Sequence, residues 1–573
     1  MPDYGSTPSR STLKKAQHRL DSMKRLRTDF EGALSDLSTH LSPRRYKDFT
    51  RKNRGKRVTS AILDPAPVYA RRTLQSGMMA GITSPARPWF RLATFDPELR
   101  EFGPVKQHLN IREKIMRETF QASNIYNFLH TVYGDIGWAG QFGGGIFSDP
   151  DHLIRGDQYR PGEYWLAADD NHQIDTMGRR ADMSVEQTVA RFGLGNVSKI
   201  VRQMYDKGDY DENIEVMSLI GPRDREKQEE AREEHPAEGR LSLPIYSYWW
   251  EEGAKDEDGL LSEGGYIETP IIAPRWEDVG DTYGYGPGWD VLPDAKQLQS
   301  MTRRKNEAIE KQVRPPMQGP TSARQSSASL MPGHVTYLDD PTGMGLKPLI
   351  ENRTNLQHLT MDIEQTKENI REGFYADLWL MLTNSTRREI TAREIEERHE
   401  EKLIALGPVL ERLQQELLRP IIERTSALLE RAGKFPEAPQ ELQGEGTLKV
   451  EYISMLAQAQ KAVATGSVER LTGFAAAGFE AFPRSRHKIN FDQAIDEMGD
   501  MLGVPPKIIR SDDEVDALNA KDDKAMQQQQ QMMAATEQAG AAQQGAGAVK
   551  QLAEATQGGS AQDLLSRLGL STP

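Results

Sequence analysis

The chain has 573 residues, of which 37% are hydrophobic and 27% are charged, with a mean hydropathy of -0.66 and a formal net charge of -13. Cysteine is absent, which excludes disulfides, thiolate metal sites, iron–sulfur clusters and a cysteine nucleophile. No apolar run reaches the ~18 residues of a membrane-spanning helix, and no apolar signal core follows Met1. We therefore expect a soluble chain. Its low apolar fraction predicts extended, solvated helices or large polar interfaces rather than one compact globule.

Positive charge is concentrated at the N-terminus. Residues 1–60 hold fifteen Lys and Arg against six Asp and Glu, so this segment carries +9 while the remaining residues carry -22. The densest basic run is 51–57. Two interpretations remain open: contact with nucleic-acid phosphates, or a solvated helix face followed by a loop.

Three helical regions are predicted in the first part of the chain. Apolar residues recur at three- and four-residue steps over 9–40, over 69–79 and again over 105–140. This spacing places them on one face of a helix.

Strands are expected on either side of a further helix. The segment 143–176 is rich in Gly and aromatic residues, and 241–278 combines aromatic and β-branched residues with turn signals. Between them, Ser184 and Gln187 fit a capping box at the start of a helix over 184–206.

The amino-acid composition changes at residue 292. The segment 292–313 is predicted to be a polar, Arg- and Lys-rich helix, which Pro315 and Pro316 end. The next segment, 316–348, is rich in Gly, Pro and Ser and contains one expected strand at 334–338.

Two more helices are predicted, over 355–382 and 391–432, with a polar break at 383–390. A helix of about forty residues spans roughly 60 Å, so the second helix is expected to lie along an assembly. Two prolines inside it should bend it and a glycine should end it: Pro408, Pro420 and Gly433.

The remaining segments are less regular. The charge run 223–239 lacks apolar periodicity and is expected to be a solvated loop or an exposed helix. Residues 448–510 are predicted to form a small helical domain. From about residue 520 the chain becomes rich in Gln, Ala and Gly, which predicts disorder, with a helical bundle between subunits as the alternative.

No constellation typical of catalysis is present in the sequence. It contains no P-loop, no G-x-S-x-G elbow, and no second His to complete a zinc motif with His399 and Glu400. The glycine-rich stretch 284–288 includes Pro287, which lacks an amide donor, so a turn is expected there rather than a phosphate cradle. We therefore predict a non-enzymatic protein with no catalytic, cofactor or metal site.

Several motifs, in order along the chain, resemble those of the head-to-tail connecting (portal) proteins of short-tailed bacteriophages. The resemblance extends over about 10–430 and fades beyond 440. The matching segments are Tyr69–Pro85 (YARRTLQSGMMAGITSP) with Trp89 and Phe90, Pro161–Trp165 (PGEYW), Met183–Ser184, Phe192–Gly193, Tyr283–Gly288 (YGYGPG), Leu292–Asp294 (LPD), Pro315–Pro316, Leu406–Leu413 (LGPVLERL) and Glu416–Pro420 (ELLRP).

The resemblance implies a mainly α fold with a minor β component (α+β), organised into the wing, stem, clip and crown regions of a ring-forming subunit. The implied regions are a basic N-terminal helix and arm (1–60), an α+β wing (61–290), a first stem helix (291–314), a clip (315–350), a second stem helix (351–383), a channel loop (384–390), a long wing helix (391–435), a crown-like helical domain (436–520) and a Gln/Ala/Gly-rich tail that is disordered or a helical barrel (521–573).

The resemblance also implies partners and a location. A ring, typically a dodecamer, would sit in the virion at one capsid vertex after synthesis in the host cytoplasm. Double-stranded DNA would pass through it, and terminase, capsid and scaffolding proteins, and later tail adaptor proteins would bind it. No membrane or cofactor is expected.

Seven cations are candidates for the DNA channel: Arg303, Arg304, Lys305, Lys311, Arg314, Arg387 and Arg388. Their alternative role is ion pairing within or between subunits. The alternative function for the whole chain is a cytosolic helical scaffold or adaptor without a DNA channel.

Overall fold

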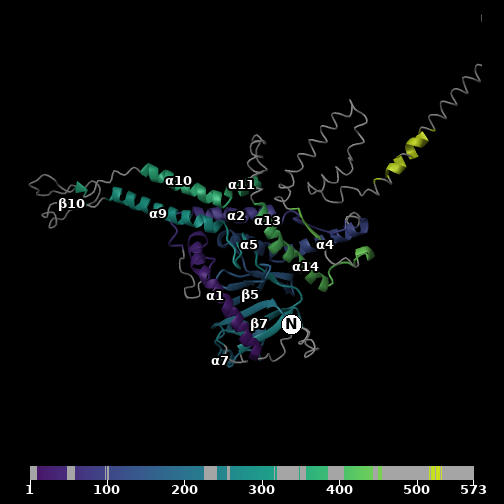
Figure 1. Ribbon diagram of the computed structural model, residues 1–573, viewed down its shortest axis with the longest axis horizontal. Helices are drawn as coiled ribbons and strands as arrows, with labels where there is room; N and C mark the ends of the chain where they lie inside the picture. Colours follow the sequence, from purple (N-terminus) through teal and green to yellow (C-terminus); the bar gives the residue numbers. More distant parts are fainter. Residues whose placement is uncertain are drawn as a thin grey trace, which may run out of the picture. The chain divides into compact units, whose positions relative to one another are not determined.

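The computed structural model describes residues 10–47, 59–96, 99, 102–224, 242–253, 259–314, 317–318, 347–348, 356–384, 406–442 and 449–453, together with parts of 515–531 (Figure 1). Contacts divide the chain into two compact units, Met1–Glu469 and Arg470–Pro573. In the second unit, residues 518–522 and 524–529 are helical. Every element described below belongs to the first unit. This unit is mainly helical with small antiparallel sheets, which confirms the predicted fold class of mainly α with a minor β component.

Helix α1 (Arg10–Leu41) confirms the predicted N-terminal helix and connects two cores. Its first half packs Leu13 and Leu20 against the largest sheet, and its second half places Leu34 and Leu41 in the main helical core. Most cations of this helix lie on the solvated side, which favours the interpretation of the helical part as an exposed face. The basic run 51–57 lies outside the described residues.

Three helices surround the main core: α2 (Ala66–Ile82), α4 (Gly103–Ala122) and α5 (Ile125–Ala139). The continuous helix expected over 105–140 is therefore wrong, because the chain breaks at Ser123 and Asn124. The Asn124 side chain donates to the Gly156 carbonyl and accepts from the Gly156 N–H, both at 2.8 Å. This exchange ties the break to the neighbouring sheet.

The strands form two larger antiparallel sheets. The order is β4-β5-β6-β7-β8 in one and β3-β2-β9 in the other. Their bounds are β2 Gly144–Asp149, β3 Leu153–Gln158, β4 Tyr164–Ala168, β5 Ile174–Ser184, β6 Asn213–Pro222, β7 Ile245–Glu251, β8 Leu260–Tyr266 and β9 Ile271–Ile272.

The strands expected within 143–176 and 241–278 are confirmed, whereas the central strand β6 was not predicted. Its residues from Val216 to Gly221 are all buried, so the strand has no alternation of apolar and polar side chains. A short, continuously buried run of this kind does not reveal its period.

The predicted capping box is present at the start of α6 (Val185–Phe192), where Ser184 and Gln187 each bond the other's backbone N–H. The helix ends at Gly193, whose φ of +86° favours glycine, so the helix expected over 184–206 is two helices. The second, α7 (Lys199–Lys207), begins after a Ser198 cap.

The long helix predicted over 391–432 also differs from the observed structure. Its part before residue 406 lies outside the described residues. The described part consists of α13 (Gly407–Leu413), a π-helical turn η3 (Gln414–Leu418) and α14 (Arg419–Arg431). Pro408 lies in the first turn of α13, and the bend predicted there is not tested, because the chain before residue 406 lies outside the described residues. Pro420 lies in the first turn of α14, directly after the π turn, where the backbone hydrogen bonds depart from the α-helical pattern. Gly433, at φ +63°, confirms the predicted stop.

Strand β12 (Lys449–Tyr452) pairs antiparallel with β1 (Phe90–Ala93), which corrects the prediction that helical structure begins at residue 448. A short helical turn, η4 (Gln440–Leu442), precedes it. The break predicted over 383–390 starts too early, because residues 383 and 384 are helical, and the rest of it lies outside the described residues. Several other predictions also fall largely or wholly outside them: the charge run 223–239, the strand at 334–338 and most of 454–573.

Candidate functional site

Helix α9 (Pro287–Val313) is the first arm of a two-helix hairpin. It begins five residues before the predicted start at 292, because Pro287 occupies the first turn, where a proline loses no helical hydrogen bond. Trp289 anchors this end by donating its indole N–H to the Ala139 carbonyl at 3.0 Å. Pro293 lies inside the helix.

Helix α10 (Leu356–Gly373) is the second arm and runs antiparallel beside α9 (Figure 1). A Cβ at Gly373 would lie 2.4 Å from Cγ2 of Val291, so this close crossing requires glycine. Beyond the other ends of the two helices, β10 (Met317–Gln318) pairs antiparallel with β11 (Lys347–Pro348). The segment between the two helices therefore leaves and returns at one end of the hairpin.

A buried amide fixes the base of the hairpin to the segment before α2. The Gln299 side chain, 5% exposed, accepts from the backbone N–H groups of Leu63 (2.7 Å) and Asp64 (2.9 Å) and donates to the Asp64 carbonyl (2.9 Å). The Asp64 carboxylate in turn lies 3.1 Å from Nζ of Lys367 on α10. These contacts hold both helices in one orientation relative to the core.

The structure separates the five candidate cations of this region. Arg303, Arg304 and Lys311 are exposed, and at about 100° per residue they lie on the side of α9 that faces away from α10. Arg314, directly after the helix, is also exposed, whereas Lys305 is half-buried on the side toward α10. Two carboxylates, Glu307 and Glu310, share the outward side with the arginines.

The outward side of α10 has the opposite charge. Ile363 and Ile370 are buried toward the core, while the exposed side chains include four carboxylates and one arginine: Asp362, Glu364, Glu368, Glu372 and Arg371. Two intrahelical ion pairs are present, Lys367 with Glu364 at 3.0 Å and Arg371 with Glu368 at 3.1 Å. The hairpin therefore has a basic side on α9 and an acidic side on α10. Arg387 and Arg388 lie outside the described residues.

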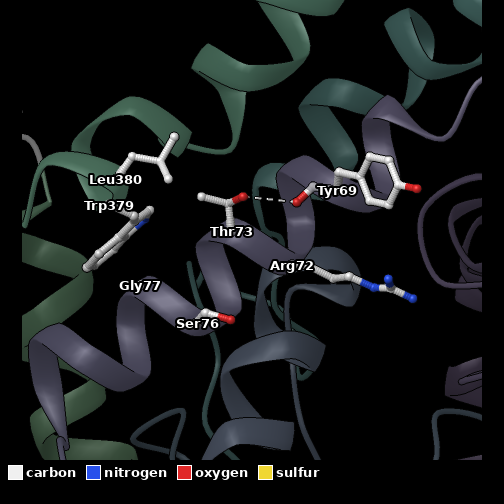
Figure 2. A pocket seen from close by; sticks show the side chains of 7 residues that line it. All are labelled: Tyr69, Arg72, Thr73, Ser76, Gly77, Trp379 and Leu380. Atoms are coloured by element: carbon white, nitrogen blue, oxygen red, sulfur yellow. Dashed lines mark hydrogen bonds between the residues drawn. The ribbon is translucent and has the colours of Figure 1, made fainter. Parts of the chain in front are cut away.

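Helix α11 (Ala376–Asn384) follows α10 after Tyr375, whose φ of +53° breaks the helix predicted over 355–382. It packs against α2 and leaves a hollow of about 340 Å3 between the two helices (Figure 2). The hollow is lined by Tyr69, Arg72, Thr73, Ser76, Gly77, Trp379 and Leu380. Several of these residues belong to the motif that supported the family resemblance, so packing against Trp379 explains part of that motif.

Other charged side chains are buried or half-buried in the region of the sheets. Arg45 forms a bidentate ion pair with Asp135, and Arg275 forms one with Glu416. The Arg27 guanidinium lies 4.5 Å from the ring centroid of Tyr283, and its nitrogens have no hydrogen-bond partner in the described part of the chain. These contacts hold separate segments together, and because the paired residues are far apart in sequence, spacing offered no signal for them.

One buried carboxyl lies beside the β1–β12 pair. Glu113 on α4 is 6% exposed, and its Oε1 accepts from the Leu92 N–H of β1 at 2.8 Å. Burial raises the pKa of Glu113 to about 7. In the described residues, no group of His, Cys, Asp and Glu has the arrangement of a metal site, and no helix is long and apolar enough to cross a membrane.

The chain belongs to the bacteriophage head-to-tail connecting proteins, since the model of the family described as "Bacteriophage head to tail connecting protein" matches residues 13–509. The resemblance predicted from the motifs is thereby confirmed.

Two curated relatives are portal proteins by name. The portal protein of Salmonella phage epsilon15 is 39% identical over 516 residues, which cover 89% of this chain and 91% of that protein. The probable portal protein of Bordetella phage BPP-1 is 40% identical over 491 residues, covering 84% and 87%. A chain from the virion of a native gene transfer agent particle has a TM-score of 0.34 and 11% identity, with coverage of 82% and 93%, a likeness too weak to define the fold.

Proposed function

We propose that the chain is a portal protein whose copies form a closed ring at one capsid vertex, through which double-stranded DNA is packaged and ejected. The observation that carries this proposal is the family match over residues 13–509, together with relatives of about 40% identity that are named portal proteins. The α9–α10 hairpin supports it, because each helix leaves one polar side exposed in the single chain.

We assign α9 and α10 to the stem of the ring and residues 315–350 to the clip that ends it. Helix α1 belongs to the basic N-terminal helix and arm, the sheets and the helices α2, α4, α5, α6 and α7 form the wing, and the helix that ends at Arg431 lies along the wing. The loop 384–390 faces the channel, and 436–520 form the crown. Duplex DNA and an acidic subunit repel one another on average, which suits a conduit that must not hold its substrate.

The partners follow from this assignment. Terminase binds the clip during packaging and hydrolyses ATP, since this chain has no P-loop and no enzymatic role. Tail adaptor proteins replace terminase afterwards, and capsid and scaffolding proteins contact the outside of the ring. The protein is a component of the virion after its synthesis in the host cytoplasm.

The ring is tested by mass photometry and electron microscopy of the purified protein. We expect a species near twelve times 64.4 kDa, with a central hole in the images. A monomer that stays stable at micromolar concentration in several buffers would contradict the proposal. An assembly without a hole would favour the alternative, a helical scaffold or adaptor.

Arg387 and Arg388 are the cations that we assign to the DNA. Repeated around the ring, they would form a cationic collar at the channel loop, facing a duplex with one charge per ~1.7 Å. We expect the double variant Arg387→Ala with Arg388→Ala to form rings but to retain packaged DNA less well, measured as encapsidated DNA per particle.

The matched control removes two exposed cations elsewhere, Lys114→Ala with Lys207→Ala, and should leave DNA retention unchanged. Wild-type retention in the Arg387 and Arg388 variant would refute the collar. Loss of rings in that variant would assign the two arginines to subunit contacts instead.

A further inference from the structure

The α9–α10 hairpin carries opposite charges on its two outer sides. On α9, Arg303, Arg304 and Lys311 point away from α10, accompanied by Glu307 and Glu310. On α10, four exposed carboxylates accompany one exposed arginine. The basic side and the acidic side belong to different helices of the same antiparallel pair (Figure 1).

Opposite charges on two sides of one subunit suit a head-to-tail contact between identical copies. In a closed cyclic ring, one surface of each subunit meets a different surface of the next, so the two surfaces must complement each other. A two-fold contact made through only one of the two sides would instead bring like charges together. Because like charges facing one another destabilise an interface, the hairpin favours the cyclic arrangement.

We infer that, in the ring, the basic side of α9 in one subunit docks on the acidic side of α10 in a second copy of this chain. The inference rests on the proposed portal function and assigns the α9 cations to subunit contacts rather than to DNA. The crossing of Val291 and Gly373 fixes the level of the contact. Since both helices rise about 1.5 Å per residue, Arg303 and Arg304 lie level with α10 near Met361.

One acidic partner at that level is unpaired. Asp362 is exposed and has no ion-pair partner among the described residues, whereas Glu364 and Glu368, within about two turns, already pair with Lys367 and Arg371 on the same helix and would share these partners with the neighbouring subunit. Met361, 67% exposed on the same outward side, supplies apolar area that a neighbouring helix would cover. Exposed ion pairs are individually weak, so the contact depends on several charges repeated at every interface of the ring.

Charge reversal tests the inference. The variant Arg303→Glu with Arg304→Glu should raise the fraction of free subunits in mass photometry about tenfold at a fixed concentration, because repulsion replaces attraction. The variant Asp362→Lys with Glu368→Lys should do the same. It leaves Glu364 in place, since Glu364 binds Lys367, which also contacts Asp64 at the hairpin base.

The decisive measurement is the combined variant with all four reversals, which should recover at least half of the rings lost in either double variant. As the matched control, Lys114→Glu with Lys207→Glu makes the same charge change far from the hairpin in sequence and should leave the rings intact. A neutral variant, Arg303→Gln with Arg304→Gln, should assemble like the wild type at high salt but less well at low salt, which separates lost attraction from misfolding.

Three outcomes would overturn the inference. Rings that form normally in both double variants would show that the charges do not face each other. Intact rings with reduced DNA retention in Arg303→Glu with Arg304→Glu would place these arginines against DNA and leave the portal function standing. Wild-type protein that forms no ring under any condition would refute the proposed function itself.

Discussion

Gly77 in α2 is the residue over which Trp379 of α11 packs. A Cβ at Gly77 would lie 2.3 Å from the Trp379 Cβ and 2.5 Å from its Cγ, and Trp379 itself is fully buried (Figure 2). Because the position of the Trp379 Cβ is set by the α11 backbone, rotation of the side chain into the neighbouring hollow cannot relieve this overlap. The glycine therefore allows the close approach of two helices that lie about 300 residues apart in the chain.

The first prediction at this scale is that Gly77→Ala destabilises the protein. The added methyl group overlaps the Trp379 side chain, and overpacking of this kind costs about 1–3 kcal/mol, more than the ~1 kcal/mol that alanine gains over glycine in a helix. The thermal unfolding midpoint should fall. Gly32→Ala is the matched control, because Gly32 lies in α1 and a Cβ added there would have nothing within 4 Å, so its midpoint should rise. Equal shifts for the two variants would contradict the packing argument.

Residue types were predictable, but their partners were not. The cations at 303–314 could be identified from sequence, and helical spacing placed them on one helix. Only the structure shows that Lys305 lies toward α10 while Arg303 and Arg304 lie away from it. Pairs such as Arg45 with Asp135 depend on how distant segments fold together, and no local pattern encodes that.

At the scale of elements, one buried carboxyl is hydrogen-bonded to strand β1 of the β1–β12 pair. The Glu113 carboxyl accepts from the Leu92 N–H, and burial raises its pKa from 4.5 to about 7. Between these two values the folded protein keeps a proton that the unfolded chain releases. Stability from this group is therefore fully present below pH 4.5 and is lost as the pH rises through about 7.

The prediction is that Glu113→Gln removes this pH dependence, because the amide oxygen still accepts from Leu92 and does not ionise. A shift of this size corresponds to roughly 3 kcal/mol. Thermal unfolding at pH 5 and pH 8 should show a smaller fall in midpoint for the variant than for the wild type. Parallel pH profiles for both proteins would mean that Glu113 is not the titrating group.

Long amphipathic helices were the elements best predicted from sequence, because a repeated three- and four-residue spacing leaves little ambiguity. Helix α1 and the Ser184 capping box agree closely with expectation. The errors occurred where tertiary contacts override local pattern: the break at Asn124, the break at Tyr375 and the buried strand β6. Strand β12 could not be predicted, since its partner β1 lies far away in the sequence.

At the scale of the whole molecule, the low apolar content has a structural counterpart. Well-buried cores exist among the sheets and the helices around α5, whereas the outer part of the α9–α10 hairpin has mostly exposed side chains. A single chain with such a hairpin has surface that suits neighbouring copies. The composition was therefore a useful guide to assembly, although it carried no information on which sides of the two helices would meet.

The pairing of β12 with β1 has a consequence for synthesis of the subunit. Ala93 pairs with Lys449, about 360 residues later in the chain. At translation rates of about 5–20 residues per second, β1 waits roughly 20 to 70 seconds on the ribosome before its partner emerges. Throughout that interval an unpaired strand edge is available to other nascent chains, and such edges promote aggregation. Truncated products that stop before residue 449 would keep this edge permanently, so incomplete subunits would be more exposed to chaperones and proteases than finished ones.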